Sequence, residues 1–262
     1  MVNSMSNSKL VTYTKLSPNK TSPRNHKIDT ITIHCFVGQV TVQRGCETFA
    51  SASRKASCNY VVAKDGKIGL VVDECDRSWC SSNSANDHRA ITIEVASDTT
   101  HPYAVTDAAL NALVELCTDI CKRNNIEALK WSFDKADRVN HLNGCNMTVH
   151  RDFAAKACPG EYLYNRHGWI ADEVNKRLSG CIQSSSTSAT TVSNTCPFTI
   201  KVANVKKGDV LNICKQPSSS AEISGKLAYN DPNVYTIVEE QGTWGRLKSG
   251  IGWINLKYTV RV

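Results

Sequence analysis

Ala90 to Ala96 reads AITIEVA, and this stretch has the alternation of a β-strand. Its isoleucines and its valine fall on one face, whereas Thr92 and Glu94 fall on the other. β-Branched residues such as these also favour extended structure. The stretch therefore predicts a strand with one apolar and one polar face, and it places Glu94 on the polar one.

Neighbouring stretches predict more strands. Ile28 to His34 (IDTITIH) alternates in the same way, and His34 ends it on the polar side. Asn59 to Ala63 and Ile68 to Val72 are rich in β-branched residues and are joined by residues 64–67, KDGK. An Asp-Gly pair between two such runs is typical of a β-hairpin.

Two helices are expected among these strands. Thr106 to Asn125 carries a broad apolar stripe, Thr106 is a suitable N-cap, and two basic residues stand near the C-terminal end. A second helix is expected from about Gly168 to Leu178, ending before Gly180. Strands interspersed with helices indicate an α/β or α+β domain, in which helices cover a sheet.

A change of composition divides the chain. Ser184 to Thr195 reads SSSTSATTVSNT, which cannot bury an apolar face and is typical of a flexible linker. We predict an N-terminal domain over residues 1–180, a Ser/Thr-rich linker over 181–196 and a small domain over 197–262. The last has short β-rich runs separated by turns, which favours a small barrel.

Composition limits the classes of protein to which this chain can belong. No apolar run is long enough to span a membrane, and residues 1–9 lack the apolar core of a secretory signal, so we expect synthesis in the cytoplasm. The chain has twelve cysteines but no C-x-x-C pair, and we expect most of them to be reduced. The formal net charge of +7 suits an anionic partner, although charge alone is equally compatible with a role in solubility.

Residues 150–160 read HRDFAAKACPG and contain candidate metal ligands. His150 and Cys158 suit zinc, and a catalytic zinc site usually needs a third protein ligand, for which His34 is the leading candidate. Glu94 is a candidate proton acceptor beside a metal-activated water. Residue types alone are also compatible with non-catalytic roles for these residues. His150 could be a surface histidine, Cys158 a buried cysteine before a turn, and Glu94 a solvated strand residue.

The motifs quoted above, together with NYVVAKDGKIGLVVDE from Asn59, resemble the type 2 N-acetylmuramoyl-L-alanine amidases over about residues 27–178. The resemblance implies an α/β fold with a mostly parallel central sheet, flanked by helices, and zinc in a surface groove. It also implies that His34, His150 and Cys158 bind Zn²⁺ and that Glu94 and Lys156 assist catalysis.

The reaction implied is hydrolysis of the amide between N-acetylmuramic acid and L-alanine in bacterial peptidoglycan. Some members of the family have a catalytic tyrosine near the start of the strand at Asn59. In this chain Cys58 takes that position and Tyr60 lies two residues further on, so a tyrosine role stays open.

The C-terminal part resembles bacterial SH3-like wall-binding domains, in its WGRL strand at Trp244 and its closing GWINLKY segment at residues 252–258. The resemblance implies binding to peptidoglycan or to anionic wall polymers, with Trp244, Trp253 and Tyr258 as candidate contacts. Core packing is an equally good interpretation of the two tryptophans.

The sequence leaves three other classes of protein open. A non-catalytic peptidoglycan receptor typically lacks the cysteine ligand, and a wall cysteine peptidase needs a cysteine at a helix start with a histidine partner. Charge alone suggests nucleic-acid binding, and no motif supports it. We expect an endolysin or autolysin that is released to the wall of a Gram-positive cell and lyses it.

Overall fold

The computed structural model describes residues 6–179, 196–203, 205–219, 221–241 and 243–262. The chain forms two compact units, Met1–Ser184 and Ser185–Val262. The predicted linker, residues 181–196, lies outside the described residues except for Cys196.

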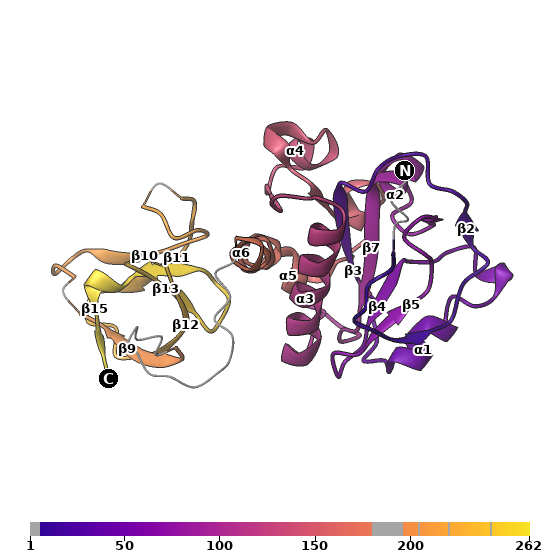
Figure 1. Ribbon diagram of the computed structural model, residues 1–262. Coiled ribbons are helices and arrows are strands. Elements are labelled where there is room, and N and C mark those ends of the chain that lie inside the picture. The colour runs from indigo at the N-terminus through magenta and orange to yellow at the C-terminus, as the bar shows by residue number, and fades with distance from the viewer. Residues whose placement is uncertain (1–5, 180–195, 204, 220, 242) are drawn as a thin grey trace. The chain divides into compact units, whose positions relative to one another are not determined.

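A six-stranded sheet forms the centre of the first unit, within residues 6–179 (Figure 1). All neighbouring strands are parallel except the predicted hairpin of β4 and β5. The mixed α/β fold with a mostly parallel sheet is therefore confirmed. The strands, in their order across the sheet, are β1 (Val11–Thr14), β5 (Ile68–Leu70), β4 (Tyr60–Val62), β7 (Ala90–Val95), β3 (Thr30–Cys35) and β8 (Met147–Thr148).

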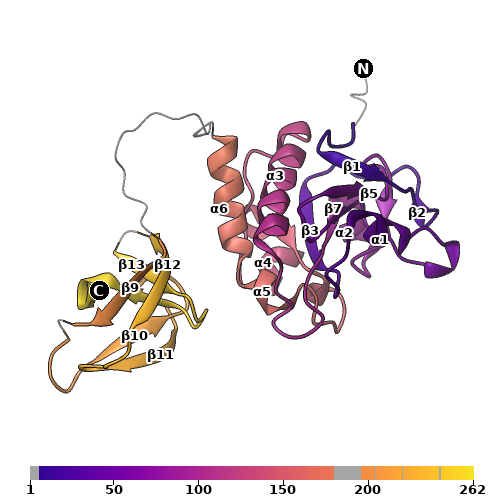
Figure 2. The same ribbon diagram turned by 90° about the horizontal axis from the view of Figure 1, so that it is seen from below.

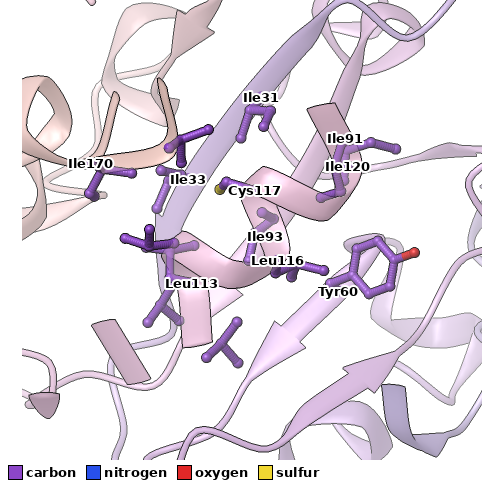
Figure 3. Packing of buried hydrophobic residues seen from close by; sticks show 14 of the residues in the cluster. Ile31, Ile33, Tyr60, Ile91, Ile93, Leu113, Leu116, Cys117, Ile120 and Ile170 are labelled. Atoms are coloured by element: carbon purple, nitrogen blue, oxygen red, sulfur yellow. The ribbon is translucent and has the colours of Figure 1, made fainter. Parts of the chain in front are cut away.

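Helices α3 (Asp107–Arg123) and α6 (His167–Leu178) lie side by side and cover one face of this sheet (Figure 2). Thr106 caps α3, as its sequence predicts, by accepting a hydrogen bond from the backbone N–H of Ala109. The apolar sides of β3 and β7 meet both helices in a single buried cluster (Figure 3). Burial of this much apolar surface is the main force that holds the unit together.

Shorter elements surround the sheet. A second apolar cluster, which includes Val42 and Val61, lies between the sheet and α1. The remaining elements are α1 (Val42–Glu47), α2 (Ser84–Arg89), α4 (Lys135–Val139), α5 (Gly160–Tyr164), the short strand pair β2 (Lys20–Thr21) and β6 (Arg77–Ser78), and the 3₁₀ turns η1 (Ala52–Arg54), η2 (Leu142–Gly144) and η3 (His150–Asp152).

The second face of β3 and β7 carries polar side chains that are nevertheless buried. Thr32 pairs in register with Thr92, and His34 pairs with Glu94 one step further along the strands. We call these four residues the polar row. Thr32, Thr92 and His34 have no exposed surface, because α2 and the segment before it cover this face.

The second unit is an all-β structure with its own small apolar core, which includes Ile200, Ile237 and Ile254. Among its described residues, each pair of neighbouring strands is antiparallel. The strands of its seven-stranded sheet, in order, are β11 (Ile223–Ala228), β10 (Val210–Cys214), β14 (Trp253–Asn255), β13 (Trp244–Leu247), β12 (Tyr235–Gln241), β9 (Phe198–Val202) and β15 (Thr259–Arg261), and η4 (Leu256–Tyr258) precedes the last.

The cysteines of the described ranges are all free thiols, and most of them are buried, in keeping with the sequence-based expectation. Cys117 and Cys121 face the sheet from α3 as small apolar side chains. Across the same ranges, none of the helices combines the length and the apolar character that a membrane crossing needs.

Candidate metal centre

His34 belongs to the polar row and lies beside Glu94 on the neighbouring strand. Its ring has no exposed surface. Burial, followed by the nearby His150, lowers the pKa of the His34 imidazole to about 3. His34 is therefore neutral at physiological pH, which is the form in which an imidazole binds a metal.

His150 stands at the start of the turn that follows β8. Asp152 fixes this turn by accepting hydrogen bonds from the backbone N–H of Val149 at 3.0 Å and from Arg138 Nη2 at 2.5 Å. The guanidinium of Arg138 in turn lies 4.6 Å from the ring centroid of Trp131. A buried ion pair therefore positions the turn that carries His150.

Cys158 comes from the segment before α5 and meets β3 from a distant part of the chain. Its Sγ lies 3.4 Å from His34 Nδ1, and the backbone N–H of Cys35 donates to the same sulfur at 3.4 Å. One ligand atom from each of His34, His150 and Cys158 lies within 4.8 Å of the other two. We call these three residues the metal ligand set.

The metal ligand set fits a tetrahedral zinc ion. Zinc–nitrogen and zinc–sulfur bonds at a tetrahedral angle separate the two ligand atoms by about 3.5 Å, which agrees with the contact between His34 and Cys158. His150 Nε2 lies 3.0 Å from Ser82 Oγ, the kind of outer contact that orients a metal-bound imidazole. Two nitrogens and one thiolate are also the donor types that zinc prefers.

Glu94 lies next to the metal ligand set. Its Oε2 is buried and has no hydrogen-bond partner among the described residues. Burial raises the pKa of the Glu94 carboxyl to about 8, with a smaller contribution from Cys35, while Arg54 opposes the shift. A carboxyl group that exchanges its proton near neutral pH is suited to general acid–base work.

Lys156 is exposed and lies on the rim of a surface cavity of about 530 Å³ that also contains Glu94 and His150. Lys156 is close enough to His150 to help burial lower the pKa of that imidazole. Arg54 and Arg77 also line the cavity. The cavity therefore reaches the metal ligand set at His150 and is rich in positive charge.

Three residues of this site were not predicted from the sequence: Cys80, Ser82 and Arg54. Cys80 Sγ lies 4.0 Å from Glu94 Oε1, and Ser82 contacts His150. All three lie in turns or loops with no periodic pattern, so their place beside Glu94 and His150 depends on the tertiary fold.

Tyr60 lies away from the metal ligand set. Its ring packs in the apolar cluster under α3 (Figure 3), and its hydroxyl donates to Glu74 Oε1 at 2.6 Å. Cys58 is fully buried, and burial together with Glu94 raises the pKa of its thiol. Glu94 therefore acts electrostatically on Cys58, the residue at the position of the family's tyrosine.

The aromatic residues singled out in the C-terminal unit differ in exposure. Trp253 is only 9% exposed, which leaves little of its ring for a ligand, and Trp244 is half-buried. Tyr258 is 38% exposed. Of the three, Tyr258 has the largest exposed fraction.

One comparison with known proteins identifies a family. A family model described as N-acetylmuramoyl-L-alanine amidase matches residues 24–161. Among the solved structures that are similar to this chain, the Staphylococcus aureus hydrolase AmiA in complex with its ligand has 17% sequence identity and a TM-score of 0.49, and the match covers 65% of this chain and 86% of AmiA. PlyL has 16% identity and a TM-score of 0.48, with 62% of this chain and 95% of PlyL covered, and a mutant endolysin from Bacillus subtilis has 17% identity and a TM-score of 0.45, with 63% of this chain and 99% of the endolysin covered. No curated protein matches the chain significantly.

Proposed function

Because this chain belongs to the N-acetylmuramoyl-L-alanine amidase family, we propose that it cleaves the bond between N-acetylmuramic acid and L-alanine in peptidoglycan, using a zinc ion held by His34, His150 and Cys158. The observation that carries the proposal is the metal ligand set. Three segments far apart in the sequence bring two imidazoles and a thiol within 4.8 Å of one another, beside an open cavity.

The residues around this set have distinct proposed roles. A bound zinc ion would supply positive charge that acidifies water and favours the ionised form of a nearby carboxyl. Glu94 would accept the proton of the attacking water and deliver it to the leaving amine of L-alanine. Lys156, on the rim of the cavity, would stabilise the oxyanion that develops on the amide carbonyl.

The cavity also suits the charge of the substrate. Peptide stems of peptidoglycan carry carboxylates, and Arg54, Lys55 and Arg77 line the cavity around Glu94. Arginine pairs with carboxylates through two parallel hydrogen bonds. We therefore assign substrate holding to this basic wall and bond cleavage to the side that carries Glu94 and His150.

The C-terminal unit is proposed to be an SH3-like wall-binding domain, which begins near residue 197 after a linker. Two observations support this: its antiparallel sheet around a small core, and its excess of basic residues, nine Lys and Arg against five Asp and Glu from Pro197 onward. A basic surface attracts anionic wall polymers. In this proposal the protein acts as an endolysin or autolysin that lyses Gram-positive walls after its release.

Mass spectrometry of digested peptidoglycan tests the proposed reaction. An amidase releases stem peptides with new L-alanine amino termini and leaves the sugar chains uncut, so no new reducing sugars form. The result that would contradict the proposal is a digest with new reducing ends, or with cuts only inside the peptide.

A further inference from the structure

Cys80 lies within the catalytic cavity, but the proposed reaction does not use it. It follows β6, and its backbone N–H donates to Asp87 Oδ2 at 3.0 Å, while Ser81 N–H donates to the other oxygen, Oδ1, at 3.1 Å. Asp87 is almost fully buried, so this turn is firmly held. The turn directs the Cys80 thiol to within 4.0 Å of Glu94 Oε1.

Cys80, Glu94 and His34 each have a ligand atom within 4.8 Å of the other two, and we call them the second set. Two buried atoms of this set, His34 Nε2 and Glu94 Oε2, have no hydrogen-bond partner among the described residues. Buried polar atoms are almost always paired, and an unpaired one is explained by a bound ion, an ordered water or a functional role. Both unpaired atoms belong to side chains that are able to bind a cation.

The donor types of the second set select a class of cation. A thiolate favours soft or borderline metals such as zinc and cadmium over magnesium or calcium, and an imidazole and a carboxylate are compatible with the same choice. We propose that Cys80, Glu94 and His34 form a second, weaker site for a thiophilic divalent cation, and that an ion bound there inhibits the enzyme.

Inhibition follows from the residues that the two sites share. His34 belongs to both sets, and its Nδ1 faces Cys158, so a second ion must use the other ring nitrogen or compete for the ring. Either arrangement makes the second site the weaker one. A cation on Glu94 also removes the proposed proton acceptor, and this part of the inference rests on the proposed function.

Titration of the reduced, metal-free, full-length protein with Cd²⁺ tests the second site directly. Native mass spectrometry would count the ions, and ultraviolet absorption of the cadmium–thiolate bond would report each cysteine that binds. We expect the wild type to take up one ion tightly and a second more weakly, with additional thiolate absorption at the second step. Cys80→Ser should take up only the first ion.

Cys75→Ser is the matched control, because Cys75 is an exposed free thiol outside the cavity lining. This variant should bind both ions as the wild type does. If wild type and Cys80→Ser bind the same number of ions with the same absorption, the second site does not exist.

Zinc inhibition separates this inference from the proposed function. For each variant the readout is the ratio of wall hydrolysis with excess zinc to hydrolysis with one equivalent. For the wild type this ratio should be as low as about 0.01, because the second ion occupies Glu94. For Cys80→Ser the ratio should be about 1. Hydrolysis that excess zinc inhibits equally in both variants would overturn the inhibitory role, whereas no hydrolysis with one equivalent would refute the proposed function instead.

Discussion

The two halves of the polar row, which lie on the same pair of strands, differ in one respect. In the half with Thr32 and Thr92, every side-chain oxygen has a partner: Thr32 shares a closed triangle of hydrogen bonds with Asn86 and Thr148. In the half with His34 and Glu94, each side chain keeps one buried atom without a partner among the residues described.

Within a single face of the sheet, this difference distinguishes side chains that stabilise the fold from side chains that serve a function. A buried polar group stabilises the fold only when it is hydrogen-bonded, so the threonine half contributes specificity and stability. The His34 and Glu94 half is left unsatisfied by the protein alone. Sites of this kind are kept where a ligand or a reaction requires them. The comparison therefore predicts activity losses in one half and stability losses in the other.

Replacement of a metal ligand should have the largest effect. Cys158→Ala removes the thiolate, so tight zinc binding should be lost and wall hydrolysis should fall by at least about 10³-fold, the scale of rate that a catalytic metal supplies. Metal content and turbidity loss of a wall suspension would measure both. Cys75→Ala, at an exposed thiol, is the control and should behave as wild type.

Glu94→Gln should separate chemistry from metal binding. Glutamine keeps the shape of the side chain but cannot accept the proton of water, so hydrolysis should fall by about 10²-fold while the zinc content stays at the wild-type level. Equal loss of zinc and of activity would mean that Glu94 is a ligand in the resting enzyme and not the proton acceptor.

The raised pKa of Glu94 predicts a pH-dependent cost in stability. Without metal, the folded protein holds this proton more tightly than the unfolded chain, so stability falls as the pH rises from 4.5 to about 8. Glu94→Gln removes that cost and should be more stable than wild type by up to about 5 kcal/mol above this range, and not below it. Urea unfolding of the metal-free proteins, followed by helical circular dichroism, measures the difference. This signal reports the first unit, where all the described α-helices lie. A difference that did not change with pH would contradict the shift.

Thr32→Val should have the smallest effect, and it should change stability and not activity. Valine keeps the shape but breaks the triangle with Asn86 and Thr148, so the free energy of unfolding should fall by about 1 kcal/mol. Zinc affinity and the rate per folded molecule should not change. A loss of zinc in Thr32→Val would contradict the proposal that the threonine half of the polar row serves only stability.

The sequence predicts the strands of the polar row because alternation is a local property. The period of two assigns Thr92 and Glu94 to one face whatever lies above that face. What covers the face is not local. We expected His34 to leave the core side of its strand, and it does so, but α2 and the turn of Cys80 bury that side as well. A single strand pattern carries no information about these distant segments.

The second unit shows a related limit. The β-rich runs expected there are FTIKVAN, DVLNICKQ, VYTIVEEQ, GTWGRLKSG and IGWINLKY, which cover β9, β10, β12, β13 and β14 but neither β11 nor β15. Ile223–Ala228 reads ISGKLA, in which serine, glycine and lysine mask the strand pattern. Pairing with β10 along its whole length makes this segment a strand. Partner strands decided these elements, whereas composition decided β9 and β12.

X-ray absorption at the zinc edge tests the central claim most directly. In the full-length protein loaded with one equivalent of zinc, the metal should have two nitrogen neighbours at about 2.0 Å and one sulfur neighbour at about 2.3 Å. In a Cys80→Ser background, which removes the thiolate of the second set, Cys158→Ser should lose the sulfur signal. A zinc ion without a sulfur neighbour in the wild type, or a sulfur signal that survives in the double variant, would contradict the account.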